Sequence, residues 1–326
     1  MRLGIIGAGR VGTSFVLAMP SAVEGILCST KEHTTQRAQS LKVKAYTDGA
    51  ALLRNCDVLL LTVRDDVIGS VAASLADSLT GADRRETCIL HCSGAMDLSS
   101  LEPLSALGYS VGSLHPLQSF AAPSGDLLRH IYMAVDGDDR AKETALFLVK
   151  ALDSKPLFVP QEERVLYHAA ACICANYTVT LQAMAQELMS RWLVPTKISD
   201  STKDSAKGSA NVSGSGSVIM DSTKPSKAAW QALLPLFQGV AANLEKAENP
   251  GSALTGPIAR GDINTVQSHL GVLPKNMIPV YIQLGMATTQ LALINQTITP
   301  LMAEELFDLF NSVHYEATTK EETSHE

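Results

Sequence analysis

Short apolar runs alternate with amphipathic helical patterns through the first half of the chain. The helical patterns lie at Val11–Met19, Asp65–Leu79 and Asp138–Leu152. The apolar runs have the length of strands and lie at Leu3–Ile6, Gly25–Cys28, Val58–Val63, Cys88–His91, Ser110–Leu114, Ile131–Val135 and Lys155–Val159. Such alternation is typical of a parallel sheet covered by crossover helices. We therefore expect a doubly wound α/β domain over residues 1–160.

The pattern changes after residue 160, where long helical periodicity replaces the short runs. Helices are predicted over Glu162–Trp192, Lys227–Ala247, Asp262–Leu270, Met277–Ile294 and Pro300–Val313. We therefore expect an all-α domain over residues 161–315. The segment 196–227 lacks the apolar side chains that would offset the entropy of ordering it, so we predict a flexible insertion there. The polar residues 316–326 are predicted to form a disordered tail.

Composition narrows the class of partner. The 326 residues carry a formal net charge of −7, and only 18% of them are charged. Nucleic-acid binding requires clustered Lys and Arg, so we expect a small-molecule substrate and no nucleic acid. The stretches His168–Gln186 and Met277–Ala303 approach the length of a membrane span, but Asn and Gln interrupt them. We interpret both as buried helices, with no membrane partner.

Cysteine usage and the start of the chain favour the cytoplasm. The six cysteines form no CxxC pair, and four lie in apolar runs, where a thiol packs as a small hydrophobic group in a reducing compartment. Met1 and Arg2 lead directly into the first predicted strand, which leaves no room for a secretory leader. The cysteine spacing also lacks the companion ligands that zinc prefers, so we expect no metal site.

A glycine-rich turn follows the first predicted strand. Its sequence is GAGRVG, and it opens the first predicted helix, which is the context that a dinucleotide-binding fingerprint requires. The first glycine permits a tight turn, the second lets backbone amides approach a pyrophosphate, and the third lets the helix pack closely on the strand. The predicted cofactor contacts here are Gly7, Ala8, Gly9, Arg10, Val11 and Gly12.

Residues at the ends of two other strands indicate which dinucleotide binds. NAD sites place a carboxylate at the end of the second strand, where it accepts hydrogen bonds from ribose hydroxyls. This chain has Ser29, Thr30 and Lys31 there, whose hydroxyls and cation suit the 2′-phosphate of NADP, although Glu32 could reach back to the ribose. Ligands in this fold lie at the carboxyl ends of strands, so further cofactor contacts are expected where the strand 58–63 ends. These contacts are Thr62, Val63 and Arg64.

Candidate catalytic residues follow the next two strands. Hydride transfer requires a nearby acid or base, and the imidazole of His115 has a suitable ordinary pKa. Pro116 restricts the backbone of His115, which is also consistent with a structural His-Pro turn. Ser93, with Gly94 beside it, could donate a hydrogen bond to the substrate or to the nicotinamide amide, or could cap a turn.

Two more candidates lie in the helical half. His168, Cys172 and Asn176 share one face of a predicted helix, which either borders the substrate or bonds neighbouring helices. Arg260 could clamp a substrate carboxylate or pair with Asp262 across a turn. Asn176 and Arg260 join His115 and Ser93 as the predicted catalytic set.

Together these motifs resemble a known family. The chain is similar to the Rossmann-like oxidoreductases whose C-terminal half is the domain of unknown function 2520. The resemblance rests on GAGRVG, TVRDDVI (Thr62–Ile68), HCSGA (His91–Ala95), GSLHPLQSF (Gly112–Phe120), YHAAA with Asn176, and LTGPIARGD (Leu254–Asp262).

That resemblance implies an NADP-binding Rossmann domain followed by a helical substrate and dimerisation domain, similar to those of pyrroline-5-carboxylate reductase and the 6-phosphogluconate dehydrogenase superfamily. A homodimer through the helical domain is therefore expected. Prephenate dehydrogenases carry a similar His-Pro, which supports His115. The catalytic lysine that β-hydroxyacid dehydrogenases place four residues before an asparagine is replaced here by Cys172.

Two functions remain open at this point. The first is an NADP-dependent oxidoreductase that transfers hydride to or from a small carbonyl, hydroxyl or imine substrate bound between the two domains. The second is a non-catalytic NADP-binding sensor or scaffold. Reduction of a deazaflavin by NADPH follows only from distant family resemblance.

Overall fold

The computed structural model describes residues 1–79, 86–193 and 226–322, with side chains up to residue 313. The chain divides into two compact units, Met1–Val179 and Thr180–Glu326. The predicted insertion 196–227 lies outside the described residues except for Ser226 and Lys227. The predicted domain boundary after residue 160 follows the change in sequence pattern, whereas the first compact unit also includes the next helix.

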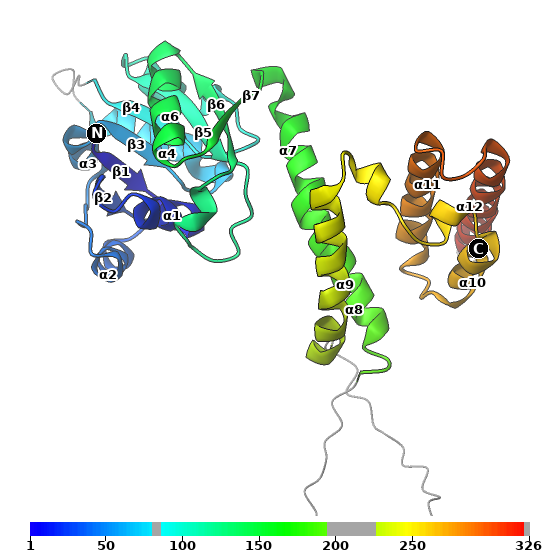
Figure 1. Cartoon of the computed structure of the whole chain (residues 1–326). Coiled ribbons are helices and arrows are strands. Elements are labelled where there is room, and N and C mark those ends of the chain that lie inside the picture. Colours follow the sequence, from blue (N-terminus) through cyan, green and yellow to red (C-terminus); the bar gives the residue numbers. More distant parts are fainter. Residues whose placement is uncertain (80–85, 194–225, 323–326) are drawn as a thin grey trace, which may run out of the picture. The chain divides into compact units, whose positions relative to one another are not determined.

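A seven-stranded sheet forms the centre of the first unit (Figure 1). The strands lie in the order β2-β1-β3-β4-β5-β6-β7. Their bounds are β1 Leu3–Ile6, β2 Val23–Leu27, β3 Val58–Leu61, β4 Cys88–His91, β5 Ser110–Pro116, β6 Tyr132–Gly137 and β7 Lys155–Phe158. All residues of β1, β3 and β4 are buried, as expected for strands covered on both faces.

One strand pair corrects the expectation of a fully parallel sheet. Strand β6 runs antiparallel to β5, while the other neighbouring pairs are parallel. A parallel neighbour requires a crossover that carries the chain back to the other end of the sheet. Between β5 and β6 the chain forms only the short 3₁₀ helix η3 (Asp126–Leu128), so β6 returns from the end at which β5 finished.

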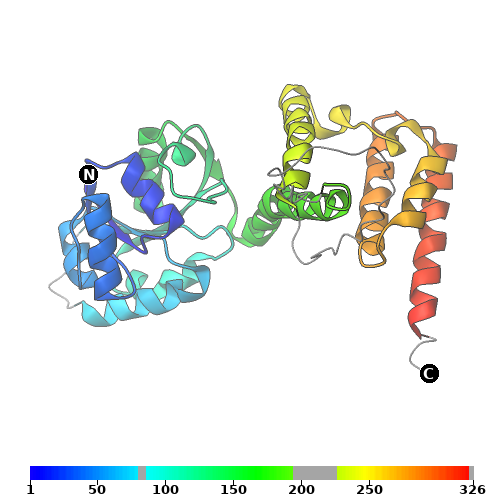
Figure 2. The ribbon, with the colours of Figure 1, turned by 90° about the horizontal axis from the view of Figure 1, so that it is seen from below.

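Helices cover both faces of this sheet (Figures 1 and 2). One face packs against α1 (Arg10–Ala18), α2 (Lys31–Leu41) and α6 (Asp139–Ala151) through a core that includes Phe15, Ala38 and Leu148. The other face packs against α3 (Gly49–Asn55), α4 (Asp65–Ser78), the 3₁₀ helix η2 (Leu98–Leu101) and α5 (Glu102–Ser105), with Leu52, Ile68 and Leu104 in its core. The doubly wound α/β fold is therefore confirmed.

Helices α2 and α3 are absent from the hydrophobic pattern. Helix α2 is mostly polar and exposed, and α3 has only seven residues. Each begins at a capping side chain: Thr30 accepts a hydrogen bond from the His33 amide, and Asp48 accepts from the amides of Ala50 and Ala51. Capping residues were thus the available sequence signal for both helices.

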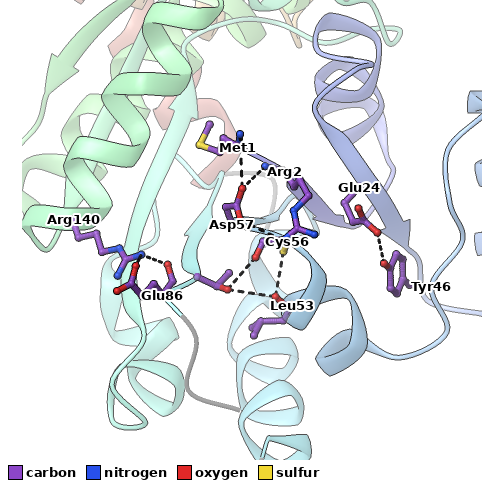
Figure 3. A network of polar contacts seen from close by, with 10 residues as sticks. Met1, Arg2, Glu24, Tyr46, Leu53, Cys56, Asp57, Glu86 and Arg140 are labelled. Atoms are coloured by element: carbon purple, nitrogen blue, oxygen red, sulfur yellow. Dashed lines mark hydrogen bonds and ion pairs between the residues drawn. The ribbon is translucent and has the colours of Figure 1, made fainter. Parts of the chain in front are cut away.

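Polar contacts join the chain segments around the amino ends of β1, β3 and β4 (Figure 3). The Asp57 carboxylate accepts a hydrogen bond of 2.6 Å from the Arg2 amide. The buried Thr87 hydroxyl, just before β4, lies 3.0 Å from the Cys56 carbonyl and 3.4 Å from the Leu53 carbonyl. Tyr46 donates to Glu24 beside β2, which lowers the pKa of that carboxyl. These contacts connect neighbouring segments within the fold.

The long helix predicted over 162–192 is interrupted. After the 3₁₀ turn η4 (Gln161–Glu163), the chain forms α7 (Arg164–Cys172), the π-helical segment η5 (Ile173–Tyr177) and α8 (Thr178–Met189). Our interpretation of this stretch as buried is wrong for the described side chains, since Ile173, Tyr177 and Val179 are each at least 60% exposed. One face of α7 is nevertheless held against the sheet by the buried Arg164.

The described part of the second unit contains helices and no strand. Ile282, Leu306 and Phe310 are among the buried residues of its core, which lies in the group α10, α11 and α12 (Figure 2). The elements are α9 (Lys227–Lys246), η6 (Pro250–Ala253), η7 (Ile258–Arg260), α10 (Ile263–Val272), α11 (Ile278–Ile294) and α12 (Pro300–Glu322).

Two expectations for this unit can be compared with the structure. Helix α12 continues to Glu322, through most of the predicted disordered tail 316–326, because Ala, Lys and Glu are good helix formers. Among the described residues, no helix combines the length and apolar character that crossing a membrane requires.

Candidate active site

The carboxyl ends of β1, β3, β4 and β5 meet at one edge of the sheet. Ile6 pairs with Leu61, Leu61 with His91, and His91 with Ser113. The glycine-rich turn, Thr62, Ser93 and His115 all lie at or just beyond this line. The strand register therefore gathers the predicted cofactor and catalytic segments that follow these strands.

The glycine-rich turn has the geometry that the fingerprint requires. Gly7 has a φ of +99°, and its carbonyl accepts hydrogen bonds from the Gly9 amide at 2.8 Å and from the Thr62 hydroxyl at 2.7 Å. A Cβ at Gly12 would lie 2.4 Å from both the Gly7 carbonyl oxygen and Thr62 Oγ1, so helix α1 can approach β3 only without a side chain there. Ala8 is buried against the sheet, whereas Arg10 is exposed.

Gly9 differs from its neighbours because its missing side chain leaves open space. It immediately precedes α1, and a Cβ built on it would meet no other atom within 4 Å among the described residues. The fold itself therefore does not require glycine at this position. A backbone that must be approached closely by a bound group does require it, and the first turn of a helix favours anions. The residues present thus fit a pyrophosphate.

The predicted cofactor residues at the ends of β2 and β3 differ in exposure, since Thr62 and Val63 are half-buried and the others are exposed. Ser29, Thr30 and Lys31 are exposed at the end of β2, where Thr30 caps α2 and Lys31 is its first residue. After β3, Val63 Cγ1 would lie 2.7 Å from a Cβ at Gly7, so it packs under the turn. Arg64 pairs with the carboxylate of Asp66 through Nε at 2.9 Å and Nη2 at 2.6 Å.

Ser93 is held inside the protein. Its hydroxyl donates to Asp65 at 2.7 Å and accepts from the amides of Ala95 and Met96. Its own amide donates to Nδ1 of the buried His91. These contacts match the turn-capping alternative for Ser93. Sequence reasoning did not identify Asp65 as its partner, because the two residues come from different strand ends.

His115 lies within β5 and pairs with Tyr167 from helix α7. Its Nδ1 lies 2.7 Å from the Tyr167 hydroxyl, and the two rings meet edge to face. Burial lowers the pKa of His115 to about 4, with further lowering from the nearby His168 and Arg164. Burial also raises the pKa of Tyr167 to about 12. At neutral pH both groups are therefore neutral.

Arg164 fixes the helix that supplies Tyr167. Its side chain is only 1% exposed, and its guanidinium donates to the Ser113 hydroxyl at 2.8 Å and to the Ser93 carbonyl at 2.9 Å. It also lies 3.9 Å from the Asp136 carboxylate. Arg164, Tyr167 and His168 are spaced i, i+3, i+4, which places them on one helix face. That spacing was the signal by which the sequence could have identified Arg164 and Tyr167.

The other two predicted catalytic residues, Asn176 and Arg260, are both exposed. Asn176 lies in the exposed π-helical segment η5. Arg260 is exposed in the second compact unit. Asp262, its alternative partner, caps α10 by accepting from the amide and the hydroxyl of Thr265. The roles of Asn176 and Arg260 stay predictions.

Comparison with known proteins agrees with this geometry. Residues 1–116 match the profile of a Rossmann-like domain, and residues 131–288 match that of the domain of unknown function 2520. The chain therefore carries the two domains that its motifs predicted. A search of curated protein sequences finds no match.

Solved structures share the fold. A provisionally assigned NADP oxidoreductase from Bacteroides fragilis is 19% identical with a TM-score of 0.65, over 89% of this chain and 98% of that one. A protein from Thermotoga maritima is 19% identical with a TM-score of 0.61, over 90% and 98%. Pyrroline carboxylate reductase from Plasmodium falciparum, solved with NADP bound, is 11% identical with a TM-score of 0.51, over 95% and 98%.

Proposed function

Because the chain combines a Rossmann-like domain with the domain of unknown function 2520, we propose that it is an NADP-dependent oxidoreductase acting on a small carbonyl, hydroxyl or imine compound. The observation that carries this proposal is the open backbone at Gly9 on the same sheet edge as the half-buried His115–Tyr167 pair. The NADP bound to the Plasmodium falciparum pyrroline carboxylate reductase, which shares this fold, supports the choice of cofactor. When bound, NADPH supplies a hydride together with its electron pair.

Each cofactor contact has a physical basis. The amides at the start of α1 would hold the pyrophosphate, with Gly9 providing the room. Ser29, Thr30 and Lys31 would hold the 2′-phosphate, since their side chains offer two hydroxyls and a cation at an exposed position. Thr62, Val63, Arg64 and Gly94 complete the cofactor-facing edge in this proposal.

His115 and Tyr167 would handle the proton. A substrate oxygen or nitrogen that gains an electron pair during hydride addition must also gain a proton. A neutral His115 can donate from Nε2 while Nδ1 takes the proton of the Tyr167 hydroxyl, 2.7 Å away. In the direction of oxidation the same path runs in reverse.

Gly9→Ala tests the cofactor site without a steric clash. The added methyl group meets no atom of the described residues within 4 Å, and replacing the N-cap glycine of α1 should lower the free energy of unfolding by no more than about 1 kcal/mol. The methyl group would occupy the space proposed for the pyrophosphate, so we expect NADP affinity to fall at least about tenfold, equivalent to roughly 1.4 kcal/mol. Calorimetric titration with NADP and with NAD measures this and also the preference between them.

The matched control is Gly271→Ala, which also adds a methyl group in open space but lies in α10. Its NADP affinity should equal that of the unchanged protein. If NADP binds Gly9→Ala as tightly as it binds the control, the pyrophosphate is not at this turn. If NADP binds and no carbonyl, hydroxyl or imine compound exchanges hydride with it, the chain is the non-catalytic sensor or scaffold.

A homodimer is part of this proposal. Several apolar side chains of α9 and α11 are exposed within the second unit, including Leu236 at 68% and Ile294 at 66%. A second copy of the chain would remove this apolar surface from water. Light scattering that gives the mass of a single chain would reject the dimer. A cytoplasmic location is also proposed, and the six free cysteines support it.

A further inference from the structure

Two imidazole rings lie against Gly94. A Cβ built on this glycine would lie 2.8 Å from both Cε1 and Nε2 of His115 and 2.8 Å from Nδ1 of His168. The two nitrogens are therefore separated by no more than twice that distance. An oxygen atom can accept a hydrogen bond of ordinary length, roughly 2.7–3.2 Å, from each of two N–H groups. It can therefore bridge two nitrogens that are separated by up to about this distance.

The neighbours of each ring determine which nitrogen carries the proton. Burial raises the pKa of Tyr167 to about 12, so the phenol keeps its proton and can donate it to Nδ1 of His115. On the other ring, the Cys172 thiol lies 3.6 Å from Nε2 of His168 and can donate to it. A neutral ring with one nitrogen that accepts such a bond carries its proton on the other nitrogen. Nδ1 of His168 is also buried and has no hydrogen-bond partner among the described residues.

We propose that His115 Nε2–H and His168 Nδ1–H together bind one oxygen atom of the substrate. The substrate is then a carbonyl compound or the corresponding alcohol, and not an imine or amine. A carbonyl oxygen has two lone pairs and gains charge during reduction, so it can accept from both rings. An imine nitrogen has one lone pair and can accept from only one of them. This inference rests on the proposed function, because it assigns the substrate class of the same site.

The assignment gives a balanced reduction. The carbonyl carbon receives the hydride and its electron pair, and the carbonyl π electrons move to the oxygen. The oxygen takes the proton from His115 Nε2, and His115 Nδ1 takes the Tyr167 proton, which solvent replaces. His168 keeps its proton and stabilises the developing negative charge, as the donors of an oxyanion hole do.

Nitrogen NMR of the full chain with ¹⁵N-labelled histidine tests the protonation states directly. We expect a protonated Nε2 at His115 and a protonated Nδ1 at His168 in neutral solution. The His115→Gln and His168→Asn variants assign the signals. A protonated Nδ1 at His115 or a protonated Nε2 at His168 would place an acceptor at the site and overturn the proposal.

Ligand binding tests the substrate class in the same spectra. In protein saturated with NADP⁺, titration with 2,2,2-trifluoroethanol should shift the signals of both His115 Nε2 and His168 Nδ1, whereas pyrrolidine should shift neither. The absence of a shift with the alcohol, or a shift with pyrrolidine alone, overturns the inference. Calorimetry on the same sample reports NADP binding, so failure of the proposed function is recognised separately.

Two substitutions separate donation from packing at His168. His168→Phe keeps the ring shape and removes the donor, so the dissociation constant for trifluoroethanol should rise about tenfold, the value of one hydrogen bond. His168→Asn keeps an N–H near the Nδ1 position, and its dissociation constant should rise by less than about threefold. Equal affinity in the two variants would show that His168 does not donate to the ligand.

Discussion

The two ends of the sheet use polar side chains differently. At the amino ends, the Asp57 carboxylate bonds to the Arg2 amide (Figure 3). The Thr87 hydroxyl bonds to the Cys56 carbonyl. At the carboxyl ends, several buried polar atoms have no hydrogen-bond partner among the described residues: His91 Nε2, Asp136 Oδ2, Arg164 Nε and His168 Nδ1. The remaining buried atom of this kind is Arg37 Nε in α2.

This difference distinguishes polar groups that stabilise the fold from polar groups that are available to a ligand. An unpaired buried polar group costs about 1–3 kcal/mol, so such groups are kept to a few per domain. Their concentration at the carboxyl edge supports the binding site proposed there. The amino edge, where polar groups satisfy one another, contributes to stability.

The largest expected effect is loss of stability in mild acid. Burial lowers the pKa of both His91 and His115 from 6.5 to about 4. Between these values the unfolded chain binds protons that the folded chain does not, so the free energy of unfolding falls as the pH falls. Each histidine accounts for roughly 3 kcal/mol, which is fully present above pH 6.5 and lost toward pH 4.

Urea unfolding across this pH range measures the loss. The double variant His91→Gln, His115→Gln should show a much smaller loss, because neither glutamine titrates. At the amino edge, hydrogen bonding from Tyr46 lowers the pKa of Glu24 from 4.5. The contribution of Glu24 to the free energy of unfolding is therefore present above pH 4.5 and disappears only below it. If the double variant lost as much stability in mild acid as the unchanged protein, the two histidines would not cause the loss. The difference in acid sensitivity between the two edges of the sheet would then not exist.

A smaller effect is expected at the amino edge. Thr87→Val keeps the shape of the side chain but removes the hydroxyl that faces the carbonyls of Leu53 and Cys56. We expect the free energy of unfolding to fall by about 1–2 kcal/mol, because buried carbonyls lose a donor. NADP affinity should stay unchanged. Weaker NADP binding with unaltered stability would show that the amino edge also serves the ligand.

The smallest effect on stability is expected for Asp66→Asn. This change weakens the exposed ion pair with Arg64, and such pairs contribute about 1 kcal/mol or less. The released Arg64 should then reach the cofactor phosphates more readily, so NADP affinity should rise a few-fold. Calorimetry and thermal unfolding measure the two quantities. Reduced NADP affinity would mean that Asp66 holds Arg64 in its binding position.

Local sequence patterns determined much of the first unit. The apolar run at Leu3–Ile6 and the glycines that follow it specify a buried strand, a tight turn and a closely packed helix, and each is observed. The positions of His115 and Ser93 near strand ends were also predictable. All of these features depend on residues only a few positions apart, so the amino-acid sequence alone predicts them.

Only the tertiary structure decided what these residues contact. Ser93 meets Asp65 from another strand end, and His115 meets Tyr167 across 52 positions in sequence. The direction of β6 likewise depended on the missing crossover helix, and no property of its own residues revealed it. Partners of this kind are selected by three-dimensional packing, because a buried polar group can bond only with a group that the fold places beside it.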